Sequence, residues 1–361
     1  MTTASSHQAV RLASDLLSAG RIDESWAEAF AAAPRDLFLP AFYSRSGDSW
    51  QLITPGTVGR QQWLKLVYND VTWVQRLDGP HHPLGTPACS CIQPSLAARL
   101  LTALPVTPGA RICEIGSGTG WLTAILSHRY GASQVTGIEL DSDLIRQASA
   151  ALAGLGYQPQ LICADGYNGD PDAAPYDAIL STAAVTWLPS AWLRQTQPGG
   201  RIVTPLRGGI AVMDVQDHDN ATGRFLAGPV QILPLRSPHH HPRNSPAVRN
   251  PLQETDPRTI ASALRDSHFR FVLELRHPDL IVTEQELLGE LILSDPGGSS
   301  VRFPPLGNPE PQEASLLWQA LNDAYLEWQQ AGRPGPSDIT LEVEHGLQWA
   351  RVSPALRWQL R

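Results

Sequence analysis

The sequence contains one lysine, four cysteines and no long apolar run, and each shortage argues against a class of protein. Lys65 is the only lysine, so 26 arginines carry the remaining positive charge, and the formal net charge is -8. Nucleic-acid-binding proteins usually carry a basic stripe, and no basic cluster stands out here. No apolar run approaches the roughly 18 residues of a membrane span. The first twenty residues also lack the charged start and apolar block of a signal peptide. We therefore predict a cytoplasmic protein without a membrane or nucleic-acid partner.

The cysteines and the one histidine cluster do not predict a metal site. Cys113 and Cys163 lie in predicted buried strands, where a free cysteine behaves as a small apolar residue. Cys89 and Cys91 are too close for an ordinary disulfide, and they lack the second ligand pair that zinc sites need. The run His239-His240-His241 is interpreted as a solvated loop, because three adjacent residues of an extended chain cannot all face one ion.

One stretch organises the chain: Arg111-Ile112-Cys113-Glu114-Ile115-Gly116-Ser117-Gly118-Thr119-Gly120. It predicts a buried strand, a glycine turn, and a helix that starts near Trp121. The glycines leave the backbone bare, so it can approach a ligand closely and adopt positive φ without steric cost. The helix N-terminus that follows offers unpaired N–H groups. The stretch therefore predicts a nucleotide-binding turn whose cofactor-binding residues are Gly116, Ser117, Gly118 and Gly120.

The spacing of this turn separates it from the turn of dinucleotide dehydrogenases. The dehydrogenase fingerprint is G-x-G-x-x-G, whereas Trp121 follows Gly120 here, so the third glycine falls one position early. Glu114 stands two residues before the first glycine. It is either a cofactor-binding residue or a buried structural acid, and the sequence leaves both open.

Two further acidic positions indicate which nucleotide the turn binds. Glu139, followed by Leu140, ends the next predicted strand, where a carboxylate can accept hydrogen bonds from both ribose hydroxyls. Asp165-Gly166 ends the third strand, where an acid can accept from an adenine amino group. These positions lie at the carboxyl ends of parallel strands, where such sheets bind ligands. The pattern predicts S-adenosyl-L-methionine as the cofactor.

Alternating strands and helices predict a doubly wound α/β sheet. We expect four parts: a helical extension with a lid or substrate segment at 1–92, the cofactor-binding domain at 93–232, a linker at 233–255 and an α+β module at 256–361. Residues 41–87 are expected to be irregular, and residues 269–275 alternate like a strand. Hairpins are expected at 290–303 and at 339–352, and a helix at 311–331.

Six segments resemble protein-L-isoaspartate O-methyltransferases, a family of class I S-adenosylmethionine-dependent methyltransferases. The resemblance covers about residues 25–215. The matching segments are Ala33-Pro34-Arg35-Asp36-Leu37-Phe38-Leu39-Pro40, Gln93-Pro94, Arg111 to Gly120, Asp165-Gly166, Tyr176 to Ala184, and Leu193 to Pro205. The resemblance implies a seven-stranded sheet and methyl transfer to the carboxylate of a peptide or protein that contains aspartate or isoaspartate.

The resemblance also implies which residues contact the substrate, and it includes one departure. Ser181 and Thr182 follow the fourth strand on the substrate side, and Ser90 is aligned with a threonine that precedes the Gln-Pro pair. We list Ser90, Ser181 and Thr182 as catalytic-site residues, although carboxylate methylation is expected to depend on alignment rather than on a general base. Ile92 stands where family members have a serine. This departure argues against the isoaspartate repair activity that is standard in the family.

Four functions remain open on the sequence. The length of the chain resembles that of actinobacterial relatives that methylate an aspartate of a macrocyclic ribosomal peptide, which then loses methanol to give aspartimide. General isoaspartyl repair is the alternative. A nucleic-acid methyltransferase is disfavoured because Ser181-Thr182-Ala183-Ala184 offers no aromatic residue and no Asn or Asp. A non-catalytic protein that binds S-adenosylmethionine is the fourth. Asp78, His81 and His82 are interpreted as a solvated loop rather than a substrate channel.

Overall fold

The computed structural model describes residues 3–47, 49–78, 85–105, 107–238, 255–285, 289–304, 310–311, 315–353 and 356–360. The chain divides into two compact units. Unit 1 comprises Met1–Ala183, Pro189–Thr204 and Ile232–Pro238, and unit 2 comprises Ala184–Leu188, Pro205–Gln231 and His239–Arg361. The domain boundaries expected from the sequence stay a prediction. His81, His82 and the histidine run at 239–241 lie outside the described residues.

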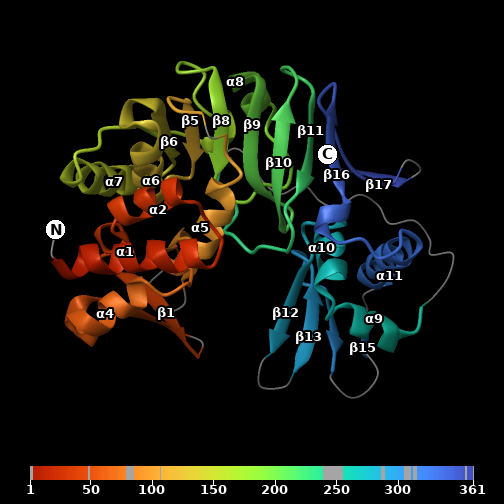
Figure 1. The fold of residues 1–361 in the computed structure, drawn as a ribbon. Helices are drawn as coiled ribbons and strands as arrows, with labels where there is room; N and C mark the ends of the chain where they lie inside the picture. The colour runs from red at the N-terminus through yellow and green to blue at the C-terminus, as the bar shows by residue number, and fades with distance from the viewer. Residues whose placement is uncertain are drawn as a thin grey trace. The chain divides into compact units, whose positions relative to one another are not determined.

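A parallel sheet forms the centre of unit 1 (Figure 1). Its strand order is β7-β6-β5-β8-β9. The strands are β5 (Ile112–Ile115), β6 (Val135–Glu139), β7 (Gln160–Cys163), β8 (Tyr176–Ser181) and β9 (Thr196–Leu206). Ile115 pairs with Ile138 on one side and with Ser181 on the other, so the carboxyl ends of three strands meet at one edge. This edge is where a ligand of such a sheet is expected.

Helices complete the α/β layer of unit 1 as the sequence predicts. They are α5 (Pro94–Leu101), α6 (Trp121–Tyr130), α7 (Ser142–Gly154) and α8 (Ser190–Gln195), with the short 3-10 turns η2 (Ala132–Gln134) and η3 (Gly166–Asn168). Helix α8 begins at Ser190, directly after Pro189, which fixes φ at its N-cap. From Ile112 to Phe225 the chain supplies seven strands, β5 to β11, as the resemblance implies.

Two N-terminal helices also form where the apolar spacing predicts them. They are α1 (Thr3–Ser18) and α2 (Glu24–Ala32). Asp23 caps α2, because its side chain accepts a hydrogen bond from the backbone N–H of Trp26 at 2.9 Å. Trp26 and Phe30 are buried, and Phe30 lies edge-on against Trp121 of α6 with ring centroids 5.8 Å apart. Trp26 and Phe30 thus form the apolar face of α2, and Phe30 attaches it to α6.

The segment 41–87, expected to be irregular, contains a four-stranded sheet, and this prediction was wrong. Its strand order is β2-β1-β3-β4. The elements are β1 (Phe42–Ser46), β2 (Ser49–Ile53), α3 (Pro55–Val58), α4 (Arg60–Val67), β3 (Trp73–Asp78) and β4 (Thr86–Cys91). These strands are short, and the β3–β4 register shifts between Val74 and Leu77, so no clean period of two is visible in the sequence.

Arg35 joins this small sheet to the parallel-sheet domain. Its side chain is fully buried and lies at the start of the 3-10 turn η1 (Arg35–Leu37). The guanidinium donates to five backbone carbonyls and lies 5.0 Å above the ring of Trp121. The acceptors are Val67 at 2.7 Å, Asn69 at 3.0 Å, Val71 at 3.0 Å, Cys91 at 3.3 Å and Ile92 at 2.8 Å. One side chain thus fixes the loop after α4 and the end of β4.

Unit 2 contains an antiparallel sheet ordered β18-β17-β16-β11-β10. Its strands are β10 (Gly209–Val215), β11 (Ala221–Phe225), β16 (Thr340–Glu344), β17 (Leu347–Ser353) and β18 (Leu356–Gln359). The predicted hairpin at 339–352 is confirmed, because β16 pairs with β17 across a turn at His345 and Gly346. Strand β11 pairs with β16, although about 115 residues separate them along the chain.

A second antiparallel sheet in unit 2 has the order β12-β13-β14-β15. It consists of β12 (Ile281–Gln285), β13 (Glu290–Ser294), β14 (Ser300–Phe303) and β15 (Glu310–Pro311). The hairpin expected over 290–303 is present as β13 and β14. The helix expected over 311–331 is α11 (Ser315–Gln330), and its predicted core face, including Leu321 and Trp328, is buried. A short turn η4 (Pro336–Asp338) and α9 (Pro257–Ala263) complete the elements.

The segment 269–275, predicted as a strand, forms the helix α10 (Ser267–Arg276) instead. Asp266 caps this helix by accepting from the N–H of His268 at 2.8 Å. Phe269, Val272 and Leu273 are buried, and they stand at i, i+3 and i+4, which is the helical spacing. The alternation of apolar and polar residues suggested a strand. The Asp266 cap and the helical spacing of the buried residues both indicate a helix, and these two signals were decisive.

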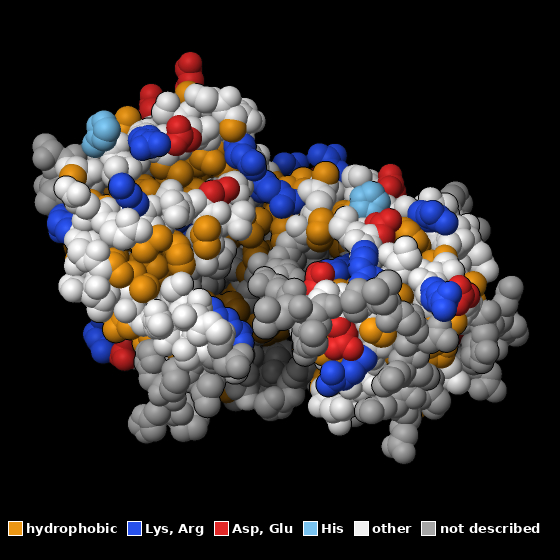
Figure 2. Space-filling model, turned by 90° about the horizontal axis from the view of Figure 1, so that it is seen from below, with side chains coloured by type: hydrophobic (Ala, Val, Ile, Leu, Met, Phe, Trp, Pro, Cys, Tyr) orange, Lys and Arg blue, Asp and Glu red, His pale blue; other side chains and the backbone are white. Residues whose placement is uncertain are grey.

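The described residues include no helix that could span a bilayer, and their charged side chains are of both signs. None of the helices in the described parts of the chain combines the length and apolar composition that a membrane span requires. On the face drawn in Figure 2, Lys and Arg side chains (blue) are interspersed with Asp and Glu side chains (red) among the described residues.

The Arg35 contacts predict a large loss of stability on truncation. Arg35→Met removes the donors of five backbone carbonyls in a buried site. We expect a decrease of about 3 kcal/mol or more in the free energy of unfolding, because each unsatisfied buried acceptor costs about 1–3 kcal/mol. Denaturant unfolding of the variant and of the exposed control Arg11→Met measures it. A decrease below about 1 kcal/mol for Arg35→Met would contradict this role.

Candidate functional site

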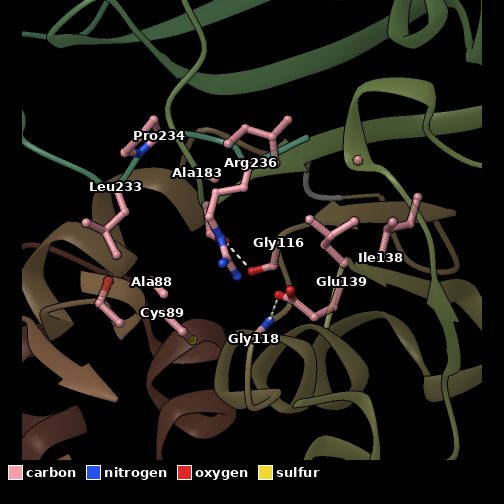
Figure 3. Close-up of a pocket in the computed structure, with 15 residues that line it drawn as sticks. Ala88, Cys89, Gly116, Gly118, Ile138, Glu139, Ala183, Leu233, Pro234 and Arg236 are labelled. Atoms are coloured by element: carbon pink, nitrogen blue, oxygen red, sulfur yellow. Dashed lines mark hydrogen bonds between the residues drawn. The ribbon is translucent and has the colours of Figure 1, made fainter. Parts of the chain in front are cut away.

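A cavity opens at the carboxyl ends of β5, β6 and β8, within unit 1 (Figure 3). It contains about 580 Å³ of empty space, part of it open to solvent. Residues from six segments line it: Ala88, Cys89, Ser90, Gly116, Gly118, Ile138, Glu139, Leu140, Gly166, Thr182, Ala183, Leu233, Pro234, Leu235 and Arg236. Seven of the twelve site residues that the sequence predicts are therefore in its wall.

The glycine turn between β5 and α6 has the backbone conformation that its sequence predicts. Gly116, Gly118 and Gly120 have φ values of 79°, 54° and 91°, which side-chain-bearing residues rarely adopt. The N–H groups of Gly116 and Ser117 both donate to the carbonyl of Ile138, at 2.8 and 3.0 Å. A Cβ on Gly118 would lie 3.6 Å from the Cys89 sulfur and 4.0 Å from the carbonyl oxygen of Gly116, which are ordinary contact distances. The turn is thus fixed to β6 and keeps its Gly118 face open to the cavity.

Glu139 holds the turn from the end of β6. One carboxylate oxygen accepts from the N–H of Gly118 at 3.0 Å, and the other accepts from the N–H of Asp141 at 3.1 Å. The side chain is 8% exposed and lies in the cavity wall. Figure 3 shows the carboxylate directed at Gly118. Each oxygen retains acceptor capacity for a ligand hydroxyl.

The two predicted residues at the carboxyl end of β8 differ in exposure to the cavity. Thr182 lies in the cavity wall, and its hydroxyl donates to the carbonyl of Gly116 at 2.6 Å. Ser181 is fully buried, and its hydroxyl donates to the carbonyl of Ala183 at 2.7 Å. Ser181 is outside the cavity lining and orders the turn that presents Thr182 and Ala183.

Glu114 lies beneath the turn and outside the cavity lining. It is 1% exposed, and the hydroxyl of Thr123 in α6 donates to its carboxyl at 2.6 Å. Burial raises the pKa of Glu114 to about 8, the Thr123 hydrogen bond opposes this rise, and the charge of Glu139 adds to it. Of the two interpretations that the sequence leaves open, this geometry favours the buried structural acid.

Asp165, Gly166, Ser117 and Gly120 complete the predicted set. Gly166 lines the cavity, whereas Asp165 caps the turn η3 by accepting from the N–H of Tyr167 at 3.0 Å and also accepts from the Ser237 hydroxyl. Ser117 is buried, and its hydroxyl has no hydrogen-bond partner among the described residues. Gly120 packs against α7, where a Cβ would lie 3.0 Å from the Cβ of Ala148.

The structure separates Ser90 from Ile92. Ser90 lines the cavity from β4. Ile92 is 8% exposed, lies outside the lining, and its carbonyl accepts from Arg35. A hydroxyl therefore stands in the cavity wall despite the departure at position 92.

Sequence reasoning missed two segments of the wall. Ala88 and Cys89 lie in β4, a strand that the sequence analysis did not predict. Leu233, Pro234, Leu235 and Arg236 lie in the stretch interpreted as the start of a linker. The prolines of that stretch suggested a linker. The apolar residues at 230, 232, 233 and 235 were the available signal against a linker, because a solvated linker is usually composed of polar or small residues.

Comparisons with known proteins agree with the geometry. The sequence model of the family "Protein-L-isoaspartate(D-aspartate) O-methyltransferase (PCMT)" matches residues 11–225. The chain belongs to this family. It is therefore an S-adenosylmethionine-dependent carboxyl O-methyltransferase, and the predicted enzyme class and cofactor are confirmed.

Several curated relatives are similar to this methyltransferase. A protein-L-isoaspartate O-methyltransferase of Methylorubrum extorquens is 39% identical over 162 residues, which are 44% of this chain and 69% of the relative. Protein-L-isoaspartate O-methyltransferase 1 of Nitrosospira multiformis is 34% identical over 174 residues, which are 46% and 72% of the two chains. A homologue in Thermotoga maritima is 29% identical over 187 residues, which are 51% of each chain.

A solved protein-L-isoaspartate O-methyltransferase structure shares the fold. It matches with a TM-score of 0.56 at 21% sequence identity and covers 96% of this chain and 99% of its own. The α/β fold class is thereby confirmed. The structural match extends well beyond residues 11–225, which the family model matches. The solved protein-L-isoaspartate O-methyltransferase therefore has a similar fold over nearly the whole of this chain.

The buried carboxyl of Glu114 predicts a pH-dependent stability. Its folded pKa, about 8, lies above the unfolded value of 4.5. The folded state therefore binds more protons between these values, and stability falls as the pH rises through this window, by at most about 1.4 kcal/mol per pH unit. Glu114→Gln removes this titration. We expect the variant to gain thermal stability relative to the wild type between pH 5 and pH 8. A constant difference across this range would contradict the buried position.

Proposed function

We propose that the cavity binds S-adenosylmethionine against the glycine turn, with Glu139 accepting hydrogen bonds from the ribose hydroxyls. The observation that carries this proposal is the carboxylate of Glu139 in the wall beside Gly118. The residues fit the group, because Gly118 leaves a cradle that a Cβ would fill and Glu139 keeps acceptor capacity. In this binding mode Gly166 and Leu140, which line the cavity, border the adenine, whereas Asp165 is outside the cavity lining.

We propose that the methyl acceptor is the free α-carboxylate of an isoaspartyl residue or the side-chain carboxylate of an aspartyl residue. When bound, S-adenosylmethionine supplies a methyl group whose S–C bond breaks, with the electron pair left on sulfur, as a carboxylate oxygen forms the new O–C bond. No proton moves, so a general base is not required. Ser90 and Thr182, which line the cavity, are assigned to positioning the acceptor. Such positioning is how a bimolecular step gains most from an enzyme.

The substrate class that we favour is isoaspartyl residues of peptides and proteins. The relatives at 34–39% identity carry this activity in their names. Methylation of a macrocyclic ribosomal peptide, leading to aspartimide, is a second candidate. The replacement at Ile92 and the residues after 225, which lie outside the family match, favour it. The solved structure that covers 96% of this chain weakens the argument from length.

A methyl-transfer assay tests the proposal. Purified protein and S-adenosylmethionine are incubated with three matched peptides that differ at one residue: isoaspartate, aspartate, and isoasparagine, which lacks the acceptor carboxylate. Mass spectrometry is expected to show one added methyl group on the isoaspartyl peptide, lost under mild alkali as an ester should be. The isoasparaginyl peptide should remain unmodified.

Two results would change the assignment. Equal methylation of the isoasparaginyl peptide would contradict a carboxylate acceptor. Methylation of an aspartate only when the peptide is macrocyclic would favour the second candidate. An oligonucleotide included as a competing acceptor tests the nucleic-acid alternative in the same reaction, and we expect no transfer to it.

A further inference from the structure

We propose that Arg236 binds the carboxylate that accepts the methyl group, and that it exchanges its partner Asp78 for this carboxylate when the substrate enters the cavity. The inference rests on the proposed function, because it requires a carboxylate acceptor in this cavity. It assigns a substrate-binding role to a segment that the sequence assigned to a linker.

The guanidinium of Arg236 lies within the cavity wall. The segment from Leu233 to Arg236 lines the cavity together with Gly116 and Thr182. In Figure 3 the side chain of Arg236 extends between Ala183 and Cys89 toward the glycine turn. Burial is the main cause that raises the pKa of the Cys89 thiol to about 12, Glu139 adds to this rise, and the charge of Arg236 opposes it. The positive charge therefore acts inside the cavity.

Charge balance calls for an anion beside this guanidinium. S-adenosylmethionine carries a sulfonium, and a second positive charge close to it is unfavourable unless an anion lies near both. The acceptor carboxylate meets this requirement, because it must approach the methyl group on the sulfonium. A guanidinium can also hold a carboxylate through two parallel hydrogen bonds, which fixes its orientation.

The present partner of Arg236 is suited to exchange. Its Nη1 lies 2.8 Å from Oδ2 of Asp78 at the end of β3. The side chains of Arg236 and Asp78 are 36% and 48% exposed, respectively, and ion pairs this exposed contribute little stability. Asp78 can therefore neutralise Arg236 without a substrate and release it at small cost when one binds.

The exchange also gives a direction to the cycle. The acceptor enters as a carboxylate and leaves as a neutral ester, which cannot form a charge-assisted pair with a guanidinium. Arg236 therefore binds substrate more tightly than product. Once the O–C bond has formed, Asp78 is again the stronger partner, which favours release of the ester.

Opposite effects of the two partners test this inference. We measure the KM for the isoaspartyl peptide and the Kd for S-adenosylhomocysteine in the full-length wild type, Arg236→Gln, Arg236→Lys and Asp78→Asn. Arg236→Gln is expected to raise the peptide KM at least about tenfold, with Arg236→Lys between it and the wild type. Asp78→Asn removes the competing carboxylate, so its KM should equal or fall below the wild-type value. The Kd for S-adenosylhomocysteine should change by less than about twofold.

The control is a second ion pair away from the cavity. Arg146 pairs with Asp143 on α7, and both side chains are exposed, so Arg146→Gln should leave KM and Kd unchanged. A rise of the peptide KM in Asp78→Asn equal to that in Arg236→Gln would show a merely structural pair and overturn the inference.

Two other outcomes also overturn it. If Arg236→Gln weakens S-adenosylhomocysteine at least tenfold but leaves methylthioadenosine binding and the peptide KM unchanged, Arg236 binds the methionyl carboxylate of the cofactor instead. If the wild type binds S-adenosylhomocysteine but methylates no peptide, the proposed function fails and the inference fails with it. An active wild type with an unchanged peptide KM in Arg236→Gln refutes the inference alone.

Discussion

The hydrogen bond from the Gly118 N–H to the Glu139 carboxylate is the interaction on which the site depends. It joins the turn after β5 to the end of β6, and the same carboxylate also accepts from Asp141, the residue that caps α7. One side chain thus sets the glycine turn, the strand end and the start of a helix around a single cavity. Glu114 stabilises the turn from below, through Thr123 of α6.

The N-terminal segment is attached to this same turn. The hydroxyl of Thr119 donates to the carbonyl of Phe38 at 2.7 Å, and the indole of Trp121 donates to the carbonyl of Ala33 at 3.0 Å. Arg35 lies between Ala33 and Phe38 in the sequence. Its side chain holds the small sheet whose strand β4 contributes Ser90 to the cavity wall. The part of the cavity wall that contains Ser90 is therefore attached to the glycine turn and to α6.

The sequence was sufficient where one local pattern determines one structure. The strand, glycine turn and helix around Gly116 to Gly120 and the helix α11 follow from spacing and residue type alone. It failed where tertiary contacts decide. The strands of the small sheet are short and irregular in register, so their pattern is weak. Leu233 to Arg236 line the cavity only because the chain returns to unit 1 at Ile232 after the 27 residues Pro205–Gln231 of unit 2, and sequence spacing carries no signal for such a return.

Titration calorimetry with S-adenosylhomocysteine tests the central claim most directly. Glu139→Ala removes the carboxylate that holds the turn and that we propose as the acceptor for the ribose hydroxyls, whereas Glu28→Ala removes an exposed carboxylate of α2. The account predicts that Glu139→Ala weakens binding at least about tenfold, or about 1.4 kcal/mol, and that Glu28→Ala binds like the wild type. Equal affinity of folded Glu139→Ala and the wild type would contradict it.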